Sequence, residues 1–514
     1  MNSKSKLSLL LTVLLFSACV LNAQEYHVTK SDAFDEPGPG WNHLLQLKNG
    51  NTFLFHIGSK GSVDISVFDK NRKVVATKSV TSKLWDVADA SDKWLYEING
   101  EPVLFLNLED HQQRTLVRIR FNPSDGGVIN EETLATVGEP KTFATVFGSL
   151  DVSKDPQSDH YAVVTCGRSR MGVEKMTVMH YDGSHKKINE TEYKGGPTGF
   201  MFINYKSMLV DGGKRIFLIL CGYTEKPKFN QSMQLTSECK VIISKVNAGE
   251  KTFSNKTMEL NVDLSDVTSQ MVYNRNSNQV QLRTKSLSES KKKVMSTTIT
   301  RYYLSLMTYF DPETLEIVNI KPLIGQKVSE YGQKHIDKEY EFNGLPNKMV
   351  INKDKTTSVL MEKTSSIESK SYRGDIGVSV LSDTGAEVNG YAIEKLQQES
   401  HGVNNEQFMS YDYISTPKGN FVLFNDYVTN FNKDEDEAKH KKISTVSLTN
   451  TVGYKLNGSG IDKFLFFGAP DDKSNVFSYM DGTDYCDGTN TYATVIIERK
   501  GRIKEAHVAW VTFD

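Results

Sequence analysis

Apolar residues occur in short runs that tight turns separate. The pattern is clearest in residues 43–57, where two apolar runs flank Asn49-Gly50. Asn-Gly is a strong hairpin signal, because both central residues of a type I′ turn need positive φ. The same order of apolar run, turn and apolar run returns around Gly100 and Gly419. The chain therefore reads as a series of antiparallel hairpins.

Two turns mark each repeating unit, one before its second strand and one after its third. First turns are expected near Gly50, Gly100, Ser158, Gly213, Asn278, Lys355, Gly419 and Lys473. Second turns are expected near Asn71, Asp125, Gly183, Ala248, Pro312, Thr384 and Gly501, and the seventh unit has no clear one. Each unit thus contains four strands, and helical periodicity is almost absent.

Repeated four-stranded antiparallel units predict an all-β fold, a β-propeller of seven or eight blades. A row of sandwich domains is the alternative, but it would normally show polar or proline-rich linkers. The expected organisation is a signal peptide at 1–23, a lead-in segment at 24–40 and a single propeller domain at 41–514. The run 508–513 would be the outer strand of the last blade, unless residues 26–28 join it and close the ring.

Loop lengths divide the propeller into two unequal faces. The turns between first and second strands and between third and fourth strands are tight. The opposite face is expected to hold the long insertions 222–238, 286–298, 363–373 and 429–442 and the crossing 325–344. Long loops in a compact fold are often functional, so a protein or glycan partner is expected on this face, with solvated hairpin tips as the alternative.

The N-terminus has the pattern of an export signal. Lys4 and Lys6 precede an apolar run, and Ala23 precedes polar residues. Three possibilities remain open: simple secretion after Ala23, lipidation of Cys19 in a lipobox-like Phe16-Ser17-Ala18-Cys19, or a retained anchor. The expected location is the periplasm, the outer membrane or the exterior, without a membrane span. A formal net charge of -2 gives no reason to expect a nucleic-acid partner.

Four cysteines follow the signal segment. Cys221 and Cys239 end one predicted strand and begin the next, so they are the candidate disulfide in an oxidising compartment. The alternative is that Cys166 and Cys221, which occupy the same place in consecutive units, are small buried residues.

No catalytic, cofactor or metal residue can be assigned from a motif. Asp481, Asp484, Asp487 and Asn490 offer oxygen ligands that would suit calcium, although their spacing differs from an EF-hand and a polar hairpin tip explains them equally well. Serine-hydrolase and zinc-peptidase motifs are absent from the sequence. Carboxylates contributed by different blades, as in propeller glycosidases, have no sequence signature because their spacing exists only in space.

The repeated strand-turn-strand pattern, Phe424-Asn425-Asp426 late in the chain and Asn22-Ala23-Gln24 at the end of the signal resemble a group of exported bacterial β-propeller-like proteins of uncharacterised function. The resemblance implies the fold and a bacterial envelope, and it carries over no functional residue.

The sequence therefore favours an exported, non-catalytic binding or scaffold protein. The alternative is a propeller hydrolase or lyase that acts on glycans with axial carboxylates. Charged residues from three or more blades around the axis would favour the alternative.

Overall fold

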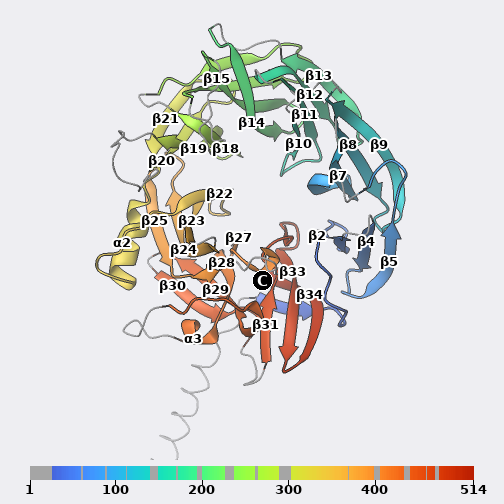
Figure 1. Ribbon diagram of the computed structural model, residues 1–514, viewed down its shortest axis with the longest axis vertical. Coiled ribbons are helices and arrows are strands. Elements are labelled where there is room, and N and C mark those ends of the chain that lie inside the picture. The colour runs from blue at the N-terminus through green and yellow to red at the C-terminus, as the bar shows by residue number, and fades with distance from the viewer. Residues whose placement is uncertain are drawn as a thin grey trace, which may run out of the picture.

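The computed structural model describes fifteen stretches of the chain, and the statements below concern these alone. They are residues 26–58, 62–86, 90–110, 113–138, 149–169, 172–193, 199–225, 237–260, 264–288, 302–367, 370–398, 406–432, 440–458, 460–468 and 474–513. Eight antiparallel sheets stand around a common axis, each sheet forming one blade (Figure 1). The prediction of an all-β propeller is confirmed, with eight blades.

The first four blades each contain four consecutive strands, given from the innermost outward. Blade 1 has β2 (Trp41–Gln46), β3 (Thr52–Ile57), β4 (Val63–Phe68) and β5 (Val74–Val80). Blade 2 has β6 (Ala90–Ile98), β7 (Glu101–Asp110), β8 (Gln113–Phe121) and β9 (Val128–Val137). Blade 3 has β10 (Ser149–Lys154), β11 (Tyr161–Ser169), β12 (Gly172–Tyr181) and β13 (Lys187–Tyr193). Blade 4 has β14 (Phe202–Asp211), β15 (Arg215–Tyr223), β16 (Lys240–Asn247) and β17 (Ser254–Thr257).

Blades 5 to 7 follow the same order. Blade 5 has β18 (Ser265–Asn274), β19 (Gln279–Ser288), β20 (Tyr302–Phe310) and β21 (Ile317–Pro322). Blade 6 has β22 (Leu345–Ile351), β23 (Thr357–Ile367), β24 (Lys370–Leu381) and β25 (Glu387–Ile393), and short β26 (Gln397–Gln398) also pairs with β24. Blade 7 has β27 (Asp412–Thr416), β28 (Gly419–Asp426), β29 (Asn450–Asn457) and β30 (Gly460–Leu465).

Blade 8 is built from both ends of the described chain. Two short inner strands, β31 (Ser474–Ser478) and β32 (Asp484–Cys486), pair with β33 (Thr491–Lys500), which is followed by β34 (Ile503–Phe513). The outermost strand is β1 (Tyr26–Lys30), antiparallel to β34. Residues 26–30 therefore belong to the propeller and not to a lead-in, and 508–513 lie in the third strand of the blade.

This closure shifts the turns of the last unit from their expected places. The turn before β33 lies at 487–490 and not near Lys473, because the inner strand is broken into two pieces. Gly501 lies between the second and third strands of blade 8, since β1 supplies the fourth.

Positive φ angles confirm the hairpin signal and refine it. Asn99 and Gly100 have φ of 54° and 77°, as a type I′ turn requires. At the first turn, Leu47 pairs with Asn51, so the loop has one more residue and only Gly50, with φ 93°, is left-handed. Asn49 accepts a hydrogen bond from the Asn51 backbone N–H through its side chain (2.9 Å) and thereby closes the turn.

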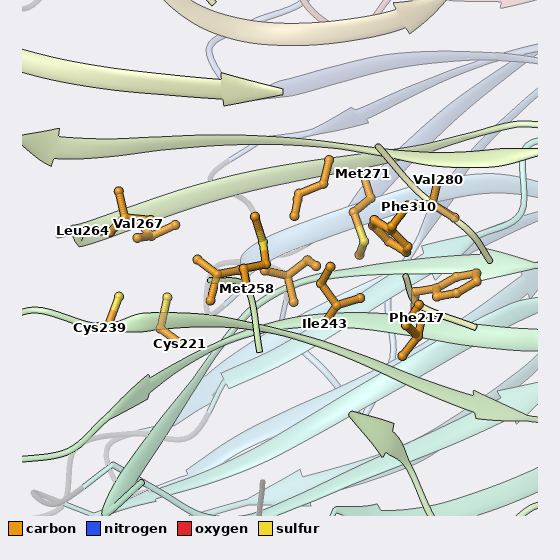
Figure 2. Packing of buried hydrophobic residues seen from close by; sticks show 14 of the residues in the cluster. Phe217, Cys221, Cys239, Ile243, Met258, Leu264, Val267, Met271, Val280 and Phe310 are labelled. Atoms are coloured by element: carbon orange, nitrogen blue, oxygen red, sulfur yellow. The ribbon is translucent and has the colours of Figure 1, made fainter. Parts of the chain in front are cut away.

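The hydrophobic core lies between neighbouring blades. One cluster joins residues of blades 4 and 5, among them Phe217 and Phe310, whose ring centroids are 6.0 Å apart (Figure 2). Strand residues that alternate toward the two faces of each blade supply these contacts, which is why the blades hold one another in place.

The face opposite the tight turns differs from the expectation in two places. The crossing 325–344 contains helix α2 (Gln326–His335), which packs against β25, and the expected loop 363–373 is largely a continuation of β23 and β24. Two 3-10 turns, η2 (Glu406–Phe408) and η3 (Val446–Leu448), and the short helix α3 (Val428–Phe431) lie around blade 7. Among the described helices, none is long and apolar enough to cross a membrane.

Candidate functional site

Charged and polar side chains lie on the innermost strands of several blades. We call five of them the axial cluster: Asp151 of β10, Tyr205 of β14, Lys348 of β22, Asp412 of β27 and Asp484 of β32. Lys348 exposes 49% of its side chain although its strand is innermost, so apolar packing does not fill the axis at this point. Five blades contribute to the cluster, which is the arrangement expected of the catalytic alternative.

Asp412 lies at the start of β27 and is almost fully buried. Its Oδ1 lies 3.5 Å from the Lys348 ammonium of the neighbouring blade and accepts a hydrogen bond from the Tyr413 backbone N–H (2.7 Å). Its Oδ2 accepts a hydrogen bond from the Thr483 hydroxyl of blade 8 (2.6 Å). One cation and two hydrogen-bond donors therefore surround the Asp412 carboxylate.

Asp484 is the first residue of β32 and directly follows Thr483. Its Oδ2 accepts a hydrogen bond from the backbone N–H of Gln46 in blade 1 (2.6 Å). Burial raises the pKa of the Asp484 carboxyl to about 7, with a further contribution from the negative charge of Glu97. At neutral pH a large fraction of Asp484 is therefore protonated.

Asp151 and Tyr205 form a second acidic pair across blades 3 and 4. The Tyr205 hydroxyl donates a hydrogen bond to the Asp151 carboxylate. Burial raises the pKa of Asp151, and burial together with the Asp151 charge raises the pKa of Tyr205 well above its ordinary value. Tyr205 consequently stays protonated at physiological pH and is suited to donating hydrogen bonds.

The axial cluster thus combines one carboxyl group whose raised pKa lets it retain a proton near pH 7 with a second that lies 3.5 Å from a lysine ammonium. A protonated carboxyl group and a second carboxyl group beside a cation are suited to general acid catalysis paired with a base or nucleophile.

The acidic hairpin tip does not bring its carboxylates together. Asp484 faces Gln46, Asp487 lies 2.8 Å from the ammonium of Lys353, and Asp481 is exposed and accepts a hydrogen bond from the Gly482 N–H (2.9 Å). Within the described stretches, no three His, Cys, Asp or Glu side chains are grouped so that they could hold a metal ion. Of the candidate calcium ligands, only Asp484 belongs to the axial cluster.

Cys221 and Cys239 lie side by side at the base of the loop 222–238 and within the same apolar cluster (Figure 2). Both are buried, and the structure does not join them by a disulfide. The pKa of Cys239 is lowered, mainly by a hydrogen bond with Cys221 and in part by one with Tyr223. Their disulfide remains a prediction. Cys19, the candidate lipidation residue, and the signal segment 1–23 lie outside the described residues.

Sequence reasoning missed four of the five cluster members, since Asp151, Tyr205, Lys348 and Asp412 stand in no common motif. Their positions in the chain span about 330 residues, between Asp151 and Asp484. The only available signal was that each lies a few residues before a first turn, which places each at a comparable depth on an innermost strand.

A cavity of about 290 Å³ lies away from the axis, between blades 5 and 6 beside the start of α2. Its apolar lining includes Met307, Leu323 and Leu381. Its one acidic residue, Glu387, already accepts hydrogen bonds from the Lys327 N–H (3.1 Å) and the Ser379 hydroxyl (2.6 Å). We do not assign a reaction to this cavity.

Comparison with known proteins found no matching family model and no matching curated protein. Solved structures do match. Polysaccharide lyase Uly1 is 8% identical with a TM-score of 0.38, over 83% of this chain and 90% of that one. A mutant of the Synechocystis apocarotenoid oxygenase is 9% identical with a TM-score of 0.33, over 69% and 74% of the two chains.

Both neighbours are described as enzymes. The expectation of a non-catalytic binding or scaffold protein therefore has no counterpart in these two neighbours, whose descriptions correspond to the alternative of a propeller enzyme. Identities and TM-scores this low transfer no residue and no reaction to this chain, so its chemistry has to be argued from the axial cluster itself.

Proposed function

We propose that this protein is a hydrolase of glycosidic bonds and that Asp484 and Asp412 are its catalytic pair. The observation that carries the proposal is the contrast between them. Asp484 has a pKa raised to about 7 by burial, whereas Asp412 is paired with Lys348 at 3.5 Å. Glycoside hydrolysis uses two carboxyl groups, one protonated and one ionised.

In this mechanism the Asp484 carboxylic acid gives its proton to the glycosidic oxygen as the bond from that oxygen to the sugar carbon breaks. The Asp412 carboxylate stabilises the positive charge that develops on the sugar, either directly or by activating a water molecule. Lys348 supplies a positive charge beside Asp412, at 3.5 Å. A glycan lyase is the second form of the same proposal, since a base and an acid on the axis also suit β-elimination.

The proposal is tested by incubating the purified protein with a panel of neutral, amino-sugar and uronate-containing oligosaccharides. Release of reducing ends measures hydrolysis, and the ultraviolet absorbance of an unsaturated product reveals a lyase. Asp484→Asn and Asp412→Asn are each expected to lower kcat by about 100-fold or more, the loss typical of acid-base catalysis.

Asp487→Asn is the matched control, because Asp487 lies in the same hairpin and is largely exposed beside Lys353. Full activity of Asp487→Asn alongside inactive Asp484→Asn supports the proposal. Cleavage that survives both Asp412→Asn and Asp484→Asn would overturn the assignment of this pair.

We propose further that the protein acts outside the cytoplasm, on the basis of the apolar segment that follows Lys4 and Lys6. Metabolic labelling with a fatty acid, in the wild type and in Cys19→Ser, distinguishes the two processing routes. Label in the wild type alone supports a lipid anchor, and absence of label from both supports cleavage after Ala23.

A further inference from the structure

A buried ion pair contacts Ser410, two residues before the candidate catalytic residue Asp412. Glu362 of β23 and Lys395, which follows β25, are in contact, and their side chains are 4% and 0% exposed. Arg373 Nη1 lies 3.9 Å from Glu362 Oε2. Burying two charges carries a large desolvation cost, and an apolar pair of similar volume is often equally stable. The energetics of folding alone therefore give no reason for this pair.

The ion pair contacts the residue that begins the Ser410-Tyr411-Asp412 segment. Ser410 has φ of +73°, a left-handed conformation that costs a non-glycine residue free energy unless its surroundings impose it. Two contacts impose this conformation on Ser410. The Gln397 side-chain oxygen accepts a hydrogen bond from the Ser410 N–H (2.8 Å), and the Ser410 hydroxyl lies 3.5 Å from both carboxylate oxygens of Glu362.

The next residue, Tyr411, extends the network to the partner of Asp412. The Lys395 ammonium lies 5.9 Å from the centre of the Tyr411 ring. The Tyr411 hydroxyl donates a hydrogen bond to Asn347 Oδ1 (2.5 Å). Asn347 immediately precedes Lys348, just as Tyr411 immediately precedes Asp412. One hydrogen bond thus ties together the two strands that carry the Asp412–Lys348 pair.

We propose that Glu362 and Lys395 are positioning residues that hold Asp412 against Lys348, acting through Ser410 and Tyr411. This inference rests on the proposed function for its catalytic meaning, but the geometry it claims can be measured without a substrate. Loss of the ion pair should let the start of β27 move, after which Lys348 loses its carboxylate.

The experiment measures how fast acetic anhydride modifies Lys348 in the full-length protein, with the modified peptide quantified by mass spectrometry. The reagent attacks the Lys348 nitrogen, which is less accessible to it while the Asp412 carboxylate lies 3.5 Å away. Asp412→Asn is expected to raise the rate several-fold, roughly three- to tenfold. Glu362→Gln is expected to raise it to the same level, and the double variant no further, because both act through one contact.

Two further variants test whether a change in the Lys348 modification rate comes only from general destabilisation of the protein. The neutral pair Glu362→Gln/Lys395→Met leaves no lone buried charge and serves if Glu362→Gln does not fold. Asp211→Asn breaks a different buried pair, with Arg215 in blade 4, and is expected to lower Tm while leaving the Lys348 rate at the wild-type value. A wild-type Lys348 rate in folded Glu362→Gln and in the neutral pair would overturn the inference.

The two proposals fail in different ways. If no glycan is cleaved, the catalytic assignment is wrong, while the Lys348 rates still decide the positioning role. If glycans are cleaved, Glu362→Gln is expected to lower kcat with little change in KM, and to cause no further loss when Asp412→Asn is already present.

Discussion

Tyr26, at the start of β1, is paired with Phe513 at the end of β34, and their ring centroids are 5.9 Å apart. The first and last described strands thereby close the ring within one sheet. The Tyr26 hydroxyl also donates a hydrogen bond to the Phe466 carbonyl oxygen of the neighbouring blade (3.1 Å).

Tyr26→Ala should destabilise the propeller, because the ring is 8% exposed and packs against three phenylalanines. A loss of about 3 kcal/mol in the free energy of unfolding is expected, as for other buried aromatic residues. Denaturant unfolding measures it. His27→Ala is the control, since His27 is exposed on the opposite side of the same strand and should change little. Equal effects of the two variants would mean that β1 does not close the ring.

Arg215 provides a second test of how neighbouring blades are held together. Its guanidinium contacts Asp211 (2.9 Å), Glu313 (2.8 Å) and the Pro312 carbonyl oxygen (3.0 Å) and is 1% exposed. Arg215→Met should lower the free energy of unfolding by about 3–5 kcal/mol, because it leaves a buried carboxylate without its closest cation. Lys214→Ala, which removes the exposed neighbour that also pairs with Glu313, should cost less than about 1 kcal/mol.

Asp484 predicts a specific dependence of stability on pH. Its pKa is about 7 in the folded protein and near 3.8 without burial. The folded state therefore binds the proton more tightly, so the contribution of this group to stability is complete below about pH 4 and is lost as pH rises through 7.

Asp484→Asn should remove this dependence. The variant is expected to gain about 2–4 kcal/mol relative to the wild type between pH 5 and pH 8, the equivalent of a shift of about 3 pKa units. Denaturant unfolding of both proteins at several pH values measures the difference. If the difference in the free energy of unfolding between the wild type and the variant does not change with pH, the Asp484 carboxyl has an ordinary pKa and the prediction is wrong.

The same group should set the alkaline limit of any glycosidase activity. Since the acid form of Asp484 donates the proton, kcat/KM should fall tenfold per pH unit well above about pH 7. Asp487→Asn should leave that limit unchanged.

If Cys221 and Cys239 form a disulfide, oxidation should consume both thiols together. Both are buried and adjacent, so a disulfide would close the loop 222–238 and stabilise the protein by up to about 3 kcal/mol. Alkylation before and after reduction, followed by mass spectrometry, measures the pairing. Two alkylated thiols in protein purified from an oxidising compartment would contradict the prediction, and Cys221→Ser is expected to remove any gain in Tm on oxidation.

The sequence by itself determined the blade architecture. The architecture depends on short-range signals: turn residues with positive φ, such as Asn99-Gly100, and alternating apolar residues. Each signal involves only a few neighbouring positions and repeats along the chain, so it can be recognised in the sequence. The division into a tight-turned face and a loop-bearing face followed from the same local signals. The exception was blade 8, where β1 comes from the opposite end of the chain and the inner strand is broken, and neither feature has a local signature.

Only the tertiary structure decided which side chains the proposed catalytic site brings together. Asp412 and Lys348 are 64 residues apart in the chain and belong to different blades, and Asp484 resembled a calcium ligand or a polar hairpin tip until its strand was placed on the axis. Closing a ring brings the same depth of every innermost strand to one axis, where burial raises the pKa of Asp484 and Lys348 pairs with Asp412. Those effects depend on distances between side chains in space, and the order of residues along the chain does not specify these distances.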